Sequence, residues 1–195
     1  TGGVINQAGA GINVTGNASI SAGAGSIGLG NQAGDTVNFG RITFNSAGTV
    51  SITEDSATLL GGANTAATLN LISAGTLTNQ AGTTLNASGV TTLNATAVNI
   101  GGGGGDAMNF NTLSVTATNG SIFVRDTNAL TVSLAQTLAG NGNIDIANGG
   151  SALALNGTRP VSANGSGSIT LSATGVLTLN DSILGDDIVS GSGNI

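Results

Sequence analysis

The sequence has no cysteine, tryptophan, tyrosine, histidine or lysine, and it contains one proline. The missing cysteines exclude a disulfide scaffold, a thiol nucleophile and a cysteine-bound metal. Without histidine or cysteine, neither a Ser-His-Asp triad nor a Cys-His pair can form. Collagen is excluded as well, because the glycines follow no three-residue period and proline is almost absent.

Charge is also scarce: 6% of the residues are charged, against about 25% in typical soluble domains. The net charge of −6 with three arginines excludes the basic surface that nucleic acid binding requires. No apolar run approaches about 18 residues, so we expect no membrane insertion. Disorder combines low hydrophobicity with high net charge, whereas this chain has a mean hydropathy of +0.30 and 39% hydrophobic residues.

What the sequence does contain is an internal repeat of about 72 residues. The segment 25–59 matches 97–130, with Asp35 opposite Asp106 and Phe39 opposite Phe110. Upstream, the sequence Asn-Gln-Ala-Gly at 6–9 recurs at 79–82. We therefore predict a single solenoid segment over 1–195, with units at roughly 4–76 and 77–148 and a divergent remainder at 149–195.

Within each unit, short stretches alternate apolar and polar residues, which is typical of half-buried strands. They lie at 42–44, 50–52, 69–71, 113–115, 122–124, 144–146, 153–155, 169–171 and 177–179. Glycine and asparagine between them favour turns, and no stretch shows helical periodicity, so we expect essentially no helix. Asn-Gly pairs would also suit hairpins. A meander with so few large residues would leave a thin core and exposed edges.

A right-handed parallel β-helix of eight to ten coils satisfies these constraints better, because stacked coils bury continuous apolar files. The repeat sets the register that we expect within each coil. Ile122 and Val124 should point inward with their counterparts Val50 and Ile52, and Phe123 and Ser51 should point outward. Glu54 should lie on an exposed corner.

The segment NFGRITFNSAGTVSITEDSATLLGG, followed by NTAATLNLISAGTLTNQAGTTLNASG, resembles repeats of very large secreted bacterial proteins, the filamentous-haemagglutinin-type and other giant adhesins. The resemblance is closest over 25–129. It implies a stalk of parallel β-helix, an extracellular location at the bacterial cell surface, and no catalytic residues or cofactors. These families carry an amino-terminal secretion cap that is not visible here, so we interpret the chain as an internal segment.

An enzyme must still be considered, because β-helices also host carbohydrate-active enzymes, and glycoside hydrolysis needs two carboxylates that face one groove. The adjacent acids are Glu54-Asp55 and Asp186-Asp187. Neighbours on a strand point to opposite faces, so neither pair makes a site alone. We interpret these acids as structural or solubilising, and we predict no catalytic residues.

Gly101–Met108 fits the glycine-rich calcium-binding repeat once. Such sites form between consecutive copies, so we favour a corner loop in which Asp106 accepts a bond from a neighbouring backbone N–H. A calcium site at Asp106 is the less favoured alternative.

Threonine ladders could bind ice, but Thr-x-Thr occurs only at 76–78 and 116–118. The sequence therefore predicts a structural stalk or spacer whose partners are neighbouring repeats of the same or an adjacent chain. A filament subunit that stacks end to end into a homopolymer is the alternative.

Overall fold

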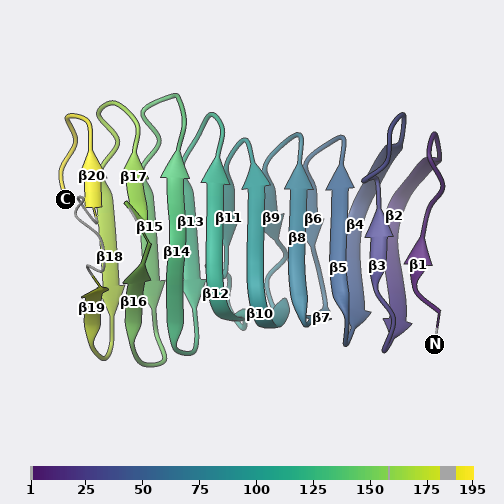
Figure 1. Ribbon diagram of the computed structural model, residues 1–195, viewed down its shortest axis with the longest axis horizontal. Coiled ribbons are helices and arrows are strands. Elements are labelled where there is room, and N and C mark those ends of the chain that lie inside the picture. Colours follow the sequence, from purple (N-terminus) through teal and green to yellow (C-terminus); the bar gives the residue numbers. More distant parts are fainter. Residues whose placement is uncertain (1, 158, 181–187) are drawn as a thin grey trace.

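The computed structural model describes residues 2–157, 159–180 and 188–195. In these residues all the strands belong to one 20-stranded sheet, and every pairing is parallel. The sheet winds into a β-solenoid of about 8 turns, and the described residues contain no helix. The two termini lie at opposite ends of the rod (Figure 1). The predicted fold class is confirmed, and the parallel pairing rules out the hairpin alternative for the described part.

The strands stack in columns along the rod. The first column contains β1 (Val4–Ile5), β3 (Ile27–Leu29), β5 (Thr49–Glu54), β8 (Thr68–Ser73), the later halves of β10 (Thr84–Ala95), β12 (Ala107–Ala117) and β14 (Leu130–Thr137), then β17 (Val161–Ala163) and β20 (Ile188–Ser190). The second column contains β6 (Thr58–Leu60), β9 (Leu77–Asn79), β11 (Val98–Ile100), β13 (Ile122–Asp126), β15 (Ile144–Asn148) and β18 (Ile169–Ala173).

The remaining strands complete the coils. β2 (Gly11–Gly23) pairs with β4 (Thr36–Ser46), which pairs with β6 and with β7 (Ala63–Ala66). β7 pairs with the first half of β10. The first part of β14 pairs with β16 (Leu153–Asn156), which pairs with β19 (Leu177–Asn180). Each of the nine predicted alternating stretches lies in one of these strands.

The core is a file of apolar side chains inside the coils. Ile122 and Val124 are buried, as are Val50 and Ile52, whereas Phe123 and Ser51 are half-exposed. The predicted inward register is therefore confirmed. Two of the four phenylalanines, Phe44 and Phe110, are fully buried. The rest of the buried apolar core consists of Val, Ile, Leu and Ala with Phe39 and Met108.

The sequence repeat and the coils differ in phase. Ile27 stacks on Val50, Val50 on Leu69, and Leu69 on Thr91, so three coils separate residues 27 and 91. The repeat counterpart of Ile27 is Val98, which lies on β11 in the second column. One sequence repeat thus spans three coils and one further side of the rod.

The local stacking nevertheless recurs from one repeat to the next. Gly30 and Gly101 have φ values of +68° and +81°, and a Cβ on either would collide with a carbonyl oxygen of the next coil, that of Thr53 or Arg125 respectively. Glycine is required at both positions, because only glycine combines this conformation with so close a backbone approach.

Candidate functional site

The Asp106 carboxylate links two stacked loops, residues 79–83 and 101–106, by hydrogen bonds, and we call this arrangement the Asp106 clasp. Its Oδ2 accepts hydrogen bonds from the Gly103 N–H at 2.6 Å and from the Asn79 side chain at 2.8 Å. Its Oδ1 accepts a bond from the Thr83 N–H at 3.1 Å, in the preceding coil. The predicted bond to a neighbouring backbone N–H is the one from Gly103, which closes the corner. The bond from Thr83 additionally joins this loop to the preceding coil.

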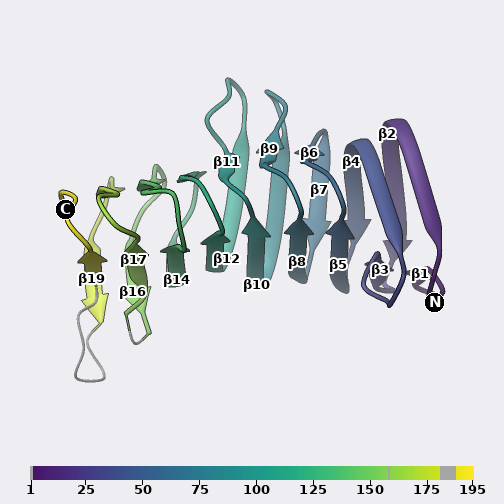
Figure 2. The ribbon, with the colours of Figure 1, turned by 90° about the horizontal axis from the view of Figure 1, so that it is seen from above.

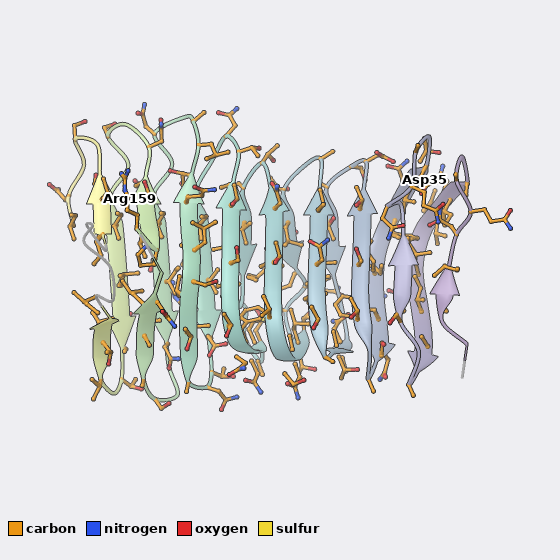
Figure 3. The ribbon with its side chains drawn as sticks, viewed as in Figure 1. Asp35 and Arg159 are labelled. Atoms are coloured by element: carbon orange, nitrogen blue, oxygen red, sulfur yellow. The ribbon has the colours of Figure 1, made fainter. Side chains whose placement is uncertain are left out.

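The same clasp recurs at Asp35. This carboxylate accepts bonds from the N–H groups of Gln32, at 2.9 Å, and Ala10, at 3.2 Å, in the preceding coil. All four loops turn through a glycine with positive φ: Gly9, Gly34, Gly82 and Gly105. Figure 2 shows the loops that follow β9 and β11 projecting side by side. In Figure 3, Asp35 lies near the N-terminal end of the rod and Arg159 near the C-terminal end.

Hydrogen bonding also changes the acidity of this exposed clasp. The Asn6 side chain, with the backbone N–H groups of Gln32, Ala10 and Gly9, holds the pKa of Asp35 below its usual value. These donors stabilise the ionised form. The carboxylate therefore keeps its charge, and its acceptor role, through the neutral range.

The oxygens of Asp106 are thus already used by protein donors, and Asp106 is the only acid in its pair of loops. No group of three or more acidic residues that could hold a metal occurs among the described residues. Calcium prefers six to eight oxygen ligands, so the arrangement fits a loop clasp better than it fits a cation site.

We predict that Asp106→Ala lowers the free energy of unfolding by about 1 kcal/mol, because three hydrogen bonds between partly exposed groups are lost. The loss should be equal with and without calcium. Thermal melts in calcium and in a chelator measure it, with Asp35→Ala as the matched variant. A calcium-dependent rise in melting temperature that disappears in Asp106→Ala would contradict the prediction.

Glu54 is not on an exposed corner, so that expectation is wrong. Its side chain is 1% exposed, and Oε1 accepts a hydrogen bond from the Phe39 N–H at 2.8 Å. The adjacent Asp55 is exposed, and it accepts a bond from the Val37 N–H at 2.7 Å. Both acids of this pair therefore bind backbone. The second acid pair, Asp186-Asp187, lies outside the described residues.

The physical reason for this burial is a short coil. The first half of β4 pairs with β2 on one side. On its other side it has no partner strand, because residues 55–57 of the next coil form a bend instead of a strand. Two carboxylates of the next coil satisfy the backbone N–H groups that are left. In the other repeat Asp126 does the same, and accepts a bond from the Phe110 N–H at 2.8 Å and one from the Asn128 N–H at 2.9 Å.

Burial raises the pKa of the Asp126 carboxyl to about 6, although the N–H groups of Phe110 and Asn128 oppose the rise. The side chain is 2% exposed. The folded protein thus binds this proton more tightly than the unfolded chain, whose carboxyl has the ordinary value of 3.8. The stabilising effect of protonation is fully present when the pH is below the unfolded pKa of 3.8, and it is lost as the pH rises through the folded pKa of about 6.

We therefore expect the stability of the wild type, relative to Asp126→Asn, to increase as the pH falls from about 7 to about 4. Two pKa units correspond to about 3 kcal/mol at most. Denaturant melts of both proteins at several pH values measure the difference. A difference that stays constant over this range, or that shrinks on acidification, would show that Asp126 is not buried in this way.

A groove of about 630 Å³ lies beside the Asp106 clasp. Its floor consists of the outward residues of β9, β11 and β13, and the loop after β11 forms one wall. The lining residues are Thr78, Asn79, Ala97, Val98, Asn99, Gly102, Gly103, Ser121 and Phe123. Sequence reasoning did not find this site. The available signal was that Phe123 and Gly102 stand opposite Ser51 and Asn31 in the repeat.

The threonine pairs that suggested an ice-binding ladder do not share a face. Thr78 lies on β9 in the second column, and Thr116 lies on β12 in the first. A flat array needs the same pattern on successive strands of one column. The described residues do not provide that pattern at these two positions.

No protein-family model, curated protein or solved structure matches the chain. The resemblance to filamentous-haemagglutinin-type repeats therefore depends on the sequence of residues 25–129, and its functional implications are proposals. Within the described residues, no helix has the length and hydropathy of a membrane span.

Proposed function

We propose that the chain is a rigid spacer segment of a large bacterial surface protein, with a mechanical and non-catalytic role. The observation that carries this proposal is the continuity of one parallel sheet and one apolar core along the described residues. Each coil is joined to the next by backbone ladders, so bending the rod would break many hydrogen bonds together. The resemblance of residues 25–129 to adhesin repeats supports a secreted, cell-surface location.

Side chains on the outside of the rod reinforce the stacking. Asn70 donates to Ser51 at 3.3 Å, and Gln136 donates to Thr116 at 3.2 Å, in each case across adjacent coils. Arg125 forms a bidentate pair with Asp145 of the next coil at 2.6 and 2.9 Å. These contacts, two between neutral side chains and one between opposite charges, each join one coil to the next.

The apolar files reach both end coils. Leu177 and Leu179 are 42% and 51% exposed at one end, and a cavity lined in part by Val4, Ile12 and Val14 opens at the other. Coils with exposed files and strand edges can accept further coils. We propose neighbouring repeats of the same chain as the partner. A filament in which adjacent copies stack end to end is the alternative that the same observation favours.

Immunogold labelling of native cells, with antibodies raised against this segment, tests the proposal. We expect label along thin fibres, at a constant distance from the cell surface. Label that is confined to the cell interior would overturn the spacer proposal. Sedimentation of the isolated segment separates the alternatives, because a filament subunit grows in mass with concentration and a spacer does not.

A further inference from the structure

The groove beside the Asp106 clasp has the size of a small-molecule binding site. Its volume of about 630 Å³ lies in the range of small-molecule sites, about 300–1,000 Å³. Asn99 and Ser121 are exposed on its surface, and Phe123 is half-exposed. Phe123 is the one phenylalanine of the chain outside the buried core. Hydrogen-bonding groups therefore surround an aromatic ring in a concave surface.

The corresponding place in the other repeat is occupied by side chains of the protein. There the Asn31 side-chain nitrogen lies 3.4 Å from where a Cβ of Gly28 would be, and Gln32 folds back to donate to the Asn6 carbonyl at 2.8 Å. The repeat counterparts of Asn31 and Gln32 are Gly102 and Gly103. The second copy of the loop has glycine in place of both side chains, which leaves this space open.

The charged side chains beside the groove are already bound by other groups of the protein. The Asp106 carboxylate is bound by three donors, as described above. The Arg125 guanidinium lies 3.6 Å from the centroid of the Phe123 ring and pairs with Asp145. Asp106 would repel an anionic ligand, and a cationic ligand would have to compete with the three donors that already bind its oxygens. The lining therefore favours a neutral, hydroxyl-rich ligand.

A peptide is a poorer fit than a sugar. β9, β11 and β13 form the floor, and each is paired with a strand on both sides. The floor therefore offers no free strand edge to which a peptide backbone could add. Sugar hydroxyls need only side-chain partners such as the Asn99 amide and the Ser121 and Thr78 hydroxyls. One face of the Phe123 ring is covered by the Arg125 guanidinium, and the part of the ring that lines the groove provides an apolar surface for the C–H face of a sugar ring.

We propose that this groove binds a neutral oligosaccharide, with Asn99, Ser121 and Phe123 as its main contacts. Such a site would give the rod a binding activity of its own, beyond its role as a spacer. The proposal predicts that any side chain at position 102 competes with the ligand. A Cβ on Gly102 would meet the Phe123 ring first, at 2.9 Å from Cε1.

Saturation-transfer NMR with a panel of tetrasaccharides tests the proposal. The probes are neutral cello-, chito- and galacto-tetraose, anionic tetragalacturonate, and an extended neutral peptide of similar length. We expect a signal from at least one neutral sugar and a Kd about tenfold weaker or more in Gly102→Asn. Gly104→Asn is the matched control in the same loop, because a Cβ there would meet nothing within 4 Å. It should bind like the wild type.

Phe123→Ser, which restores the residue of the other repeat, is a second variant and should weaken binding similarly. Melting temperatures of all variants establish that they are folded. The proposal is overturned if no neutral sugar gives a signal, if Gly104→Asn loses binding as much as Gly102→Asn, or if only the peptide or the anionic sugar binds.

Discussion

Replacing Ile122 with alanine is expected to lower the free energy of unfolding by about 2–5 kcal/mol. Ile122 is 1% exposed and stacks between Val98 and Ile144 in the second column. Truncation would remove buried methylene groups and leave a cavity, because the coils above and below are fixed by their own ladders. Each coil contacts only its neighbours, so we expect local fraying rather than a different fold.

Phe123→Ala is the matched control for Ile122→Ala. The two residues are adjacent on β13 and point to opposite sides, and Phe123 is half-exposed. Its loss should cost about 1 kcal/mol or less, mainly from the contact with the Arg125 guanidinium. Denaturant melts compare the variants, and hydrogen exchange locates the fraying. If Phe123→Ala proves the more damaging, the register of this column is wrong.

Glu54→Ala is expected to cost about 1–3 kcal/mol, because it leaves the buried Phe39 N–H without an acceptor. Phe39 is 5% exposed and Glu54 is 1% exposed, so water cannot readily replace the lost oxygen. An exposed corner glutamate would instead change stability by within about 0.5 kcal/mol. Thermal or denaturant unfolding of the variant distinguishes the two cases.

Glu54→Gln separates the role of hydrogen bonding from that of charge. Glutamine keeps the side-chain oxygen that accepts the hydrogen bond from the Phe39 N–H. It removes the negative charge of the carboxylate, whose second oxygen, Oε2, is buried without a hydrogen-bond partner in the described residues. We therefore expect a much smaller loss than in Glu54→Ala. Equal losses in both variants would show that the charge, and not the acceptor, supports this strand.

The strands, the turns and the inward files were predictable from the sequence. Alternation such as Ile122-Phe123-Val124 is a local signal, because side chains on a strand point to opposite faces with period two. The loops with Asp35 and Asp106 were predictable as corners, since glycine and aspartate favour turns regardless of what lies beyond them. The repeat then indicated that the units stack, which favoured a solenoid over a meander.

Other features depended on which residues the coils bring together. The sequence repeat suggested that matching residues share a face, but Ile27 and Val98 lie in different columns because one repeat spans three coils and one further side of the rod. Glu54 is buried because a short coil leaves the Phe39 N–H to be satisfied, and no pattern near Glu54 records that need. The groove likewise forms only where the glycine-rich loop lies beside Phe123 of the following coil. The sequence by itself determined the local β-structure and its inward face, whereas coil lengths and stacking in three dimensions decided the partners of each side chain.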